Sequence, residues 1–219
     1  MKIGLQSPVT GRNDREAARN RAAFRRRGLF VFNLIGSPGT GKTSLLEAMA
    51  GEFGDAMAVI EGDVQTRRDA DRIEGKGCRA VQIETHGACH LDASMVGRAA
   101  EGLFALGGEW KVLAVENVGN LICPSSYDLG ENVKIGMLSL AEGDDKVLKY
   151  PSIFSRIGML VTSKIDLLPH MDFDIDRAES ECRSLNPGVS CFRVSARTGE
   201  GIPGLCSHIL SEREKALRV

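Results

Sequence analysis

The sequence lacks several features that would assign it to a specialised class. No stretch reaches the roughly 18 consecutive apolar residues of a membrane-spanning helix, and residues 1–5 are followed by polar residues rather than by an apolar signal core. There is no internal repeat, no low-complexity tract and no long linker rich in Pro, Gly or Ser. We therefore expect a cytoplasmic protein that spans no membrane and has no membrane partner.

An excess of charge of one sign is also missing. The 219 residues carry 28 basic and 29 acidic side chains, which gives a net charge of -1. Because no overall field draws the chain to polyanions, nucleic acid is not an expected partner. The six cysteines are scattered without the spacing of a disulfide scaffold, and a chain of this length needs no disulfides to be stable. We interpret them as free thiols.

The composition is that of an ordinary globular protein, with 42% hydrophobic and 26% charged residues. The one candidate boundary lies near Gly28. Before it, the chain is rich in alanine and holds eight basic against two acidic groups, and Asn13 followed three residues later by Glu16 resembles a capping box. We predict an N-terminal helical segment over residues 1–28 and one main domain over residues 29–219.

From Leu29 onward, short apolar runs alternate with longer helical patterns, which is typical of βαβ units around a mainly parallel sheet. The pattern predicts strands over residues 30–35, 57–61, 80–84, 112–116, 135–140, 158–162 and 190–194. It predicts helices over residues 43–53, 66–76, 91–106, 173–185 and 203–216. Such sheets bind ligands at the carboxyl ends of their strands, so the residues directly after each strand are the candidates for function.

The first strand end carries a phosphate-binding motif. Residues 36–43 read G-S-P-G-T-G-K-T, a match to G-x-x-x-x-G-K-[ST] between a predicted strand and a predicted helix. The glycines let backbone N–H groups face phosphate oxygens, Lys42 neutralises the outer phosphates, and the Thr43 hydroxyl can ligate Mg²⁺. The sequence thus predicts a P-loop NTPase whose nucleotide contacts include Gly36, Ser37, Gly39, Thr40, Gly41, Lys42, Thr43 and Ser44.

Two further strand ends offer carboxylates to the same site. Glu116 ends the fourth predicted strand, where it can hold Mg²⁺, and the N–H of Gly119 can sense the γ-phosphate. Asp63 follows the second strand, either as a Mg²⁺ ligand or as the group that orients the attacking water. A solvated turn carboxylate is the alternative interpretation of Asp63. We predict Lys42, Asp63 and Glu116 as the catalytic groups.

The base site is predicted at the last two strands. Residues 163–166 read S-K-I-D, in the position where guanine-specific enzymes carry N-K-x-D. The carboxylate of Asp166 can accept from the guanine ring N–H and exocyclic amine, and the Lys164 stem can cover the base. Ser195 and Ala196 follow the seventh strand and can offer backbone N–H groups to the guanine carbonyl. The pattern favours GTP over ATP, although Ser163 replaces the usual Asn.

Cys89, His90 and Cys123 form a candidate second metal site. Thiolate and imidazole ligands favour Zn²⁺, Ni²⁺ or copper over Mg²⁺, although buried thiols are often inert core residues. Three ligands do not close a tetrahedral site, so water or a symmetry-related copy must complete it, and His86 can assist. Because Cys123 follows Glu116 closely in the sequence, a nucleotide-dependent rearrangement there would change metal affinity.

Taken together, the blocks resemble one family, the hydrogenase nickel-incorporation GTPases called HypB. The resemblance covers residues 33–47, 61–66, 89–93, 116–124, 128–130, 142–146, 148–151 and 166–169. It implies a SIMIBI-type α/β fold and a homodimer formed with GTP that hydrolyses GTP to GDP. It further implies Ni²⁺ or Zn²⁺ on Cys89, His90 and Cys123, nickel delivery to the [NiFe]-hydrogenase large-subunit precursor, and a nickel chaperone as partner.

Some features depart from the family pattern, and other functions stay open. Residues 1–30 contain neither Cys nor His, so the nickel-storage tract of many members is not expected in this segment. His86 stands where glycine is common, and the related urease accessory type carries Cys-Pro-His, whereas Cys123-Pro124 is followed by Ser125. The alternatives are delivery to another nickel enzyme, a nonenzymatic metal-binding scaffold held by nucleotide, and a small-molecule kinase.

Overall fold

The computed structural model describes residues 10–62, 73–85 and 87–218. Its strands form one sheet in the order β3-β2-β4-β1-β5-β6-β7, and every neighbouring pair is parallel. The predicted α/β class with a mainly parallel sheet of seven strands is thereby confirmed. The strands are β1 (Phe30–Gly36), β2 (Met57–Glu61), β3 (Arg79–Gln82), β4 (Val112–Glu116), β5 (Val133–Ser139), β6 (Met159–Ser163) and β7 (Ser190–Val194).

Seven α-helices accompany the sheet in the described residues. They are α1 (Thr10–Arg26), α2 (Lys42–Phe53), α4 (Ala93–Ala105), α5 (Lys146–Lys149), α6 (Pro151–Phe154), α7 (Ile175–Leu185) and α8 (Ile202–Leu217). The sequence did not predict α5 and α6, because four residues are too few to show helical periodicity. The helix predicted over residues 66–76 lies mostly outside the described residues.

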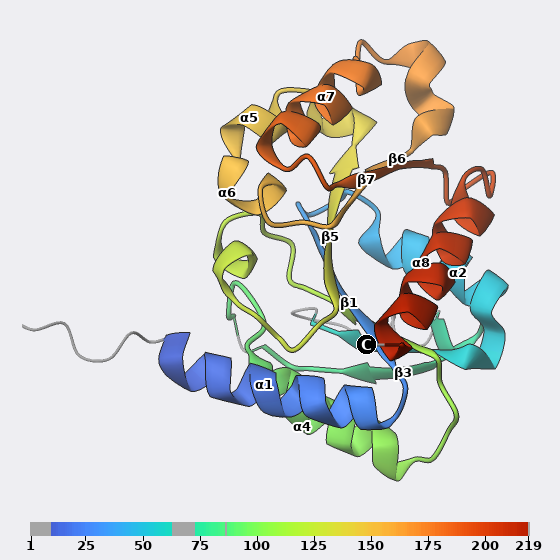
Figure 1. Ribbon diagram of the computed structural model, residues 1–219. Helices are drawn as coiled ribbons and strands as arrows, with labels where there is room; N and C mark the ends of the chain where they lie inside the picture. Colours follow the sequence, from blue (N-terminus) through green and yellow to red (C-terminus); the bar gives the residue numbers. More distant parts are fainter. Residues whose placement is uncertain (1–9, 63–72, 86, 219) are drawn as a thin grey trace, which may run out of the picture.

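Helices cover both faces of the sheet (Figure 1). On one face, α2 and α8 pack against each other over β1. On the other face, α1 lies beside α4, while α5, α6 and α7 cover the part of the sheet formed by β5 and β6. Strand β1 is buried along its whole length, as expected for a central strand of a parallel sheet. Its carboxyl end therefore has a rigid support on both sides.

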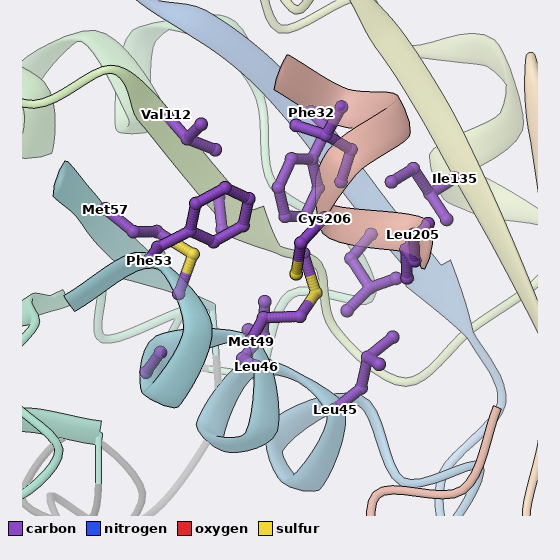
Figure 2. Close-up of a cluster of buried hydrophobic side chains, with 14 of the residues drawn as sticks. Phe32, Leu45, Leu46, Met49, Phe53, Met57, Val112, Ile135, Leu205 and Cys206 are labelled. Atoms are coloured by element: carbon purple, nitrogen blue, oxygen red, sulfur yellow. The ribbon is translucent and has the colours of Figure 1, made fainter. Parts of the chain in front are cut away.

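The largest core cluster lies between α2, α8 and the sheet, as Figure 2 shows. Phe32 of β1 and Leu46 and Met49 of α2 are fully buried there. Burial of side chains of this size contributes about 1.5–3 kcal/mol each. Because α2 begins directly at the phosphate motif, this packing fixes the helix end that bears the motif.

Helix α1 differs from its prediction at Asn13. The helix already includes Thr10, so Asn13 is inside it and not a cap. Its side chain accepts from the Ala93 N–H at 2.9 Å and donates to the Asp128 carbonyl at 2.7 Å. Glu16 pairs instead with Arg19 at 2.8 Å. The capping-box interpretation is wrong because tertiary partners use the Asn13 amide, whereas the division at residue 28 stays a prediction.

Two chain-wide features bear on function. Within the described residues, no helix combines the length and the apolarity needed to cross a bilayer. The six cysteines are free thiols, as interpreted from the sequence, and only Cys89 among them is exposed. An exposed thiol is available to a metal or a partner in a way that buried thiols are not.

Candidate functional site

The phosphate motif forms a tight loop between β1 and α2. Gly39 and Gly41 have φ angles of 79° and 90°, in the left-handed region that glycine adopts without strain. A Cβ atom on Gly36 would lie 2.8 Å from Thr40 Oγ1 and 3.1 Å from Met137 Cβ. The glycines are therefore required by the backbone path, and the loop wraps round the N-terminus of α2, where anions bind favourably.

Lys42 lies inside this loop. Its side chain is buried, and Nζ lies 3.3 Å from the carbonyl oxygens of both Gly36 and Ser37, to which it donates. Thr40 Oγ1 donates to the same Ser37 carbonyl at 2.9 Å. The loop carbonyls thus hold the ammonium group within the loop, where it can contact the outer phosphates of a bound nucleotide.

Thr43 and Glu116 lie together beside the loop. The Thr43 hydroxyl lies 3.0 and 3.2 Å from the two carboxylate oxygens of Glu116, because Glu116 pairs in register with Leu34 near the end of β1. Hydroxyl and carboxylate oxygens are the ligands Mg²⁺ prefers, so these residues fit a nucleotide-bound Mg²⁺. Asp63 and His86, two predicted contributors, lie outside the described residues.

Gly119 follows Glu116 and lies against the loop. A Cβ atom there would lie 2.9 Å from Pro38 Cγ and 3.0 Å from Pro38 N. Only a glycine allows this close approach, so the stretch after β4 is in direct contact with the phosphate loop. The predicted role of the Gly119 N–H in sensing the γ-phosphate is compatible with this position.

A cavity of about 520 Å³ opens beside the loop at the carboxyl ends of β6 and β7. Its lining includes three of the four predicted base-binding residues, Lys164, Asp166 and Ala196, and two residues of the phosphate motif, Thr40 and Gly41. Asp166 accepts from Ser195 Oγ at 2.6 Å, which fixes one carboxylate oxygen. The structure therefore brings the predicted base site and the phosphate loop together.

Lys164 and Ser163 both attach the base site to the phosphate loop. Among the described residues, Lys164 is the one non-glycine with a positive φ, at 62°, a strained conformation of the kind that clusters at functional sites. Its Nζ donates to the Gly39 carbonyl at 2.7 Å. The buried Ser163 hydroxyl donates to the Thr40 carbonyl at 2.8 Å. Ser163, at the end of β6, thus bonds to the phosphate loop at the position where the N-K-x-D pattern has Asn.

Ser195 has a different role from the one predicted for its backbone. Its N–H donates to the Glu200 carbonyl at 2.9 Å, so this N–H already has a protein acceptor. Its hydroxyl orients Asp166 and also accepts from the Thr198 N–H at 3.2 Å. The turn after β7 is therefore rigid, and the backbone donor for a guanine carbonyl is left to Ala196, which lines the cavity.

The Ser163 bond gives a first testable prediction. We expect Ser163→Ala to lower the free energy of unfolding by about 1–2 kcal/mol, because it removes the buried donor to the Thr40 carbonyl. Saturating GDP should raise the free energy of unfolding of both the wild type and the variant, since bound nucleotide stabilises the folded state. The measurement is denaturant unfolding with and without GDP. Ser184→Ala, which removes an exposed hydroxyl on α7, is the control, and equal losses in both variants would contradict the prediction.

The three predicted thiol and imidazole ligands also meet. Ligand atoms of Cys89, His90 and Cys123 all lie within 4.8 Å of one another, with Cys89 Sγ 3.4 Å from His90 Nδ1. Cys89 and His90 precede α4, and Cys123 begins the short helix η2 (Cys123–Ser126). We call this group the Cys/His cluster. Two segments distant in sequence thus supply a donor set suited to Ni²⁺ or Zn²⁺.

Protonation in the Cys/His cluster follows from its contacts. Burial lowers the pKa of His90, so its imidazole is largely neutral at physiological pH and can act as a ligand. A hydrogen bond with the Cys123 thiol raises the pKa of Cys89. A metal ion must displace that thiol proton, and metal binding at neutral pH is therefore expected to release protons.

Sequence reasoning missed several residues that support the Cys/His cluster. The Tyr127 ring lies against the His90 ring, with centroids 3.9 Å apart, and the Tyr127 carbonyl accepts from Lys134 Nζ at 2.8 Å. Buried Asn117 accepts from the Leu91 N–H at 3.1 Å. A polar residue directly after an apolar strand, as Asn117 is, was the available sequence signal.

Comparison with known proteins places these features in a family. A family model described as "CobW/HypB/UreG, nucleotide-binding domain" matches residues 30–193. Hydrogenase maturation factor HypB from Azotobacter chroococcum is 48% identical over 99% of this chain and 71% of the relative. The Escherichia coli HypB is 45% identical over 91% of this chain and 69% of the relative.

Solved structures agree with the sequence matches. HypB from Helicobacter pylori, crystallised in complex with nickel, superposes with a TM-score of 0.90 at 39% identity and covers 94% of this chain and 97% of that one. HypB from Archaeoglobus fulgidus gives a TM-score of 0.85 at 33% identity, covering 93% of this chain and 99% of that one. The receptor FtsY of Elizabethkingia anophelis, at 14% identity and a TM-score of 0.51 over 84% of this chain and 67% of that one, shares the fold alone. The chain belongs to the HypB family of hydrogenase maturation factors, within the CobW/HypB/UreG group of nucleotide-binding domains.

Proposed function

We propose that this protein is a GTP-hydrolysing metallochaperone that delivers nickel to the [NiFe]-hydrogenase precursor during its maturation. The observation that carries the proposal is the Cys/His cluster, whose ligand atoms lie within 4.8 Å of one another. Strand β4 ends at Glu116, which lies at the nucleotide site, and Cys123 follows seven residues later in the sequence. Nucleotide and metal are therefore proposed to bind to neighbouring parts of one sheet edge.

The nucleotide chemistry is assigned to groups at that edge. Lys42 and the loop N–H groups bind the phosphates, Thr43 and Glu116 hold the Mg²⁺ that accompanies them, and Asp166 reads the guanine. In hydrolysis, a water oxygen forms a bond to the γ-phosphorus and the bond to the β-γ bridging oxygen breaks. Asp63 is proposed to orient that water or to ligate Mg²⁺. A fixed electrostatic environment for the phosphates is what such sites contribute most.

The metal chemistry supports a carrier rather than a structural site. Structural zinc sites are closed by four protein ligands, whereas the part of one chain that the structure describes offers three in the Cys/His cluster, of which Cys89 is exposed. A second copy related by a two-fold axis can supply the missing ligands. We therefore propose that the chain forms a homodimer with GTP and holds Ni²⁺, or Zn²⁺ in its place, at the interface.

Delivery requires a donor and an acceptor of nickel. We propose a nickel chaperone of the same pathway and the hydrogenase large-subunit precursor as these partners, acting in the cytoplasm. The Helicobacter relatives are named hydrogenase/urease maturation factors; the Helicobacter pylori one is 39% identical over 97% of this chain. Delivery to a second nickel enzyme is therefore the alternative that a specific observation favours.

The decisive experiment measures Ni²⁺ stoichiometry, Ni²⁺ affinity and oligomer mass on the same samples. With GDP we expect monomers, and with Mg²⁺ and a nonhydrolysable GTP analogue we expect dimers with a changed Ni²⁺ affinity. Cys89→Ala should remove the Ni²⁺ site and the nucleotide-dependent change with it. Cys191→Ala, which alters a half-buried thiol on β7, is the matched control. Unchanged mass and affinity in both nucleotide states would refute the proposed gating.

A further inference from the structure

The stretch that follows Glu116 touches both the phosphate loop and the Cys/His cluster. Gly119 lies against Pro38 of the loop, and the stretch ends in Cys123, itself a member of the cluster. Two asparagines within it, Asn117 and Asn120, hydrogen-bond to the other ligand-bearing segment, residues 89–91. Thiolate and imidazole, not amides, are the side chains that suit Ni²⁺ and Zn²⁺, so we look for the role of the two asparagines in these bonds.

Asn117 is anchored in the sheet. Its N–H donates to the Leu34 carbonyl at 3.0 Å, which continues the β1–β4 pairing by one residue. Its side chain is buried, and Nδ2 donates to Asn33 Oδ1 of β1 at 3.1 Å. The position of the Asn117 side chain is therefore fixed by β1, which leads into the phosphate loop, and by β4, which ends at Glu116.

The oxygen of the same side chain reaches the metal segment. Oδ1 accepts from the Leu91 N–H at 3.1 Å and from the Val118 N–H at 3.0 Å. Leu91 directly follows Cys89 and His90, and its side chain is fully buried. A Cβ atom on Gly62 would lie 2.7 Å from Leu91 Cδ1, so the segment has no room to shift toward β2. One amide thus joins both segments to the sheet.

Asn120 makes a second bond at the exposed side. Its Nδ2 donates to the carbonyl of Cys89 at 3.3 Å, and its Oδ1 accepts from the Ile122 N–H at 2.8 Å. The bond to Cys89 acts on a ligand residue itself, and the bond to Ile122 acts on the neighbour of Cys123. Any displacement of Gly119 by a γ-phosphate would strain or break these bonds.

We infer that Asn117 and Asn120 are positioning residues that transmit the nucleotide state to the Cys/His cluster, so that GTP and GDP give different nickel affinities. The inference rests on the proposed function and names the residues through which its gating acts. Coupling between two sites is reciprocal, so nickel must change the ratio of GTP-analogue affinity to GDP affinity by the same factor. That equality provides an internal check on the measurement.

The test compares Ni²⁺ affinity with GDP and with a nonhydrolysable GTP analogue, by titration calorimetry, in the full-length chain. We expect the wild type to show a ratio of about fivefold or more between the two states. Asn117→Ala and Asn120→Ala should bind nickel and nucleotide, with the ratio falling to unity. Asn132→Ala is the matched control, because it removes a side-chain acceptor for the Val31 N–H near the other end of β1. It should keep the wild-type ratio.

The outcomes separate the inference from the proposed function. A purely structural role for Asn117 would lower thermal stability or weaken nickel binding equally in both nucleotide states, and would leave the ratio intact. If Asn117→Ala keeps the wild-type ratio, the inference is overturned. If Asn117→Ala does not fold, the same result in Asn120→Ala overturns it. A wild-type ratio of unity would instead defeat the proposed gating, and the inference with it.

Discussion

Asp166→Asn is expected to change base preference from guanine to xanthine. In the proposed base site the carboxylate accepts from two donors of guanine, whereas an asparagine amide would place an NH₂ group against the exocyclic amine of the base. Xanthine has a carbonyl at that position, which accepts from the amide. A site whose buried polar groups are mispaired can reject a ligand by ~10⁴-fold, and a loss of GTP affinity of this order is expected, with a gain for xanthosine triphosphate.

The Asp166→Asn substitution should preserve the hydrogen bond that Asp166 accepts in the folded protein. Ser195 Oγ donates to Asp166 Oδ1 at 2.6 Å, and the asparagine oxygen can accept the same bond. The second carboxylate oxygen has a loose ion pair with the exposed Arg197, at 3.8 Å, which contributes little. Competition binding with GTP, xanthosine triphosphate and ATP measures the change. Asp172→Asn, an exposed residue with the same change of charge, is the control, and unchanged GTP affinity in Asp166→Asn would place the base elsewhere.

Lys42→Ala is expected to reduce GTP hydrolysis by about 10²–10³-fold, the usual effect of removing one preorganised group that stabilises developing charge. Lys42 Nζ is held by the carbonyls of Gly36 and Ser37 at 3.3 Å, in the loop where phosphates are proposed to bind. Phosphate release under single-turnover conditions measures the loss of rate. Lys215→Ala, on the exposed side of α8, is the control.

The same variant distinguishes an enzyme from a scaffold. If GTP hydrolysis drives nickel delivery, Lys42→Ala should lose hydrogenase maturation together with hydrolysis. Full maturation activity in a variant that does not hydrolyse GTP would support a nonenzymatic scaffold held by nucleotide. Transfer of the γ-phosphate to an acceptor other than water would instead support a small-molecule kinase.

The sequence predicted the features that depend on neighbouring residues. Alternating apolar runs gave the positions of all seven strands to within a few residues, because buried parallel strands are continuous apolar stretches bounded by turns. The phosphate loop followed from the spacing of its glycines, whose positive φ angles the structure shows at Gly39 and Gly41. The HypB resemblance rested on many such short blocks in a fixed order, and the comparisons confirm it.

Contacts between segments that are distant in the sequence could be identified only from the tertiary structure. Ser163 bonds to Thr40, which lies 123 residues away in the sequence. Serine, in place of the usual Asn, therefore still attaches the predicted base site to the phosphate loop. Asn13 was expected to cap a helix, but its amide bonds to Ala93 and Asp128. A side-chain amide can serve either purpose, and the choice depends on which partners the fold brings near.

The same distinction applies to the site as a whole. The sequence by itself determined which residues carry suitable chemistry, namely Lys42, Thr43, Asp166 and the three members of the Cys/His cluster, because residue type and local spacing fix it. Only the tertiary structure decided which of them meet. The strand order places β4 beside β1, so Glu116 reaches Thr43 and Asn117 reaches Leu91. Strand order depends on how the helices pack on the two faces, and that packing has no local signature in the chain.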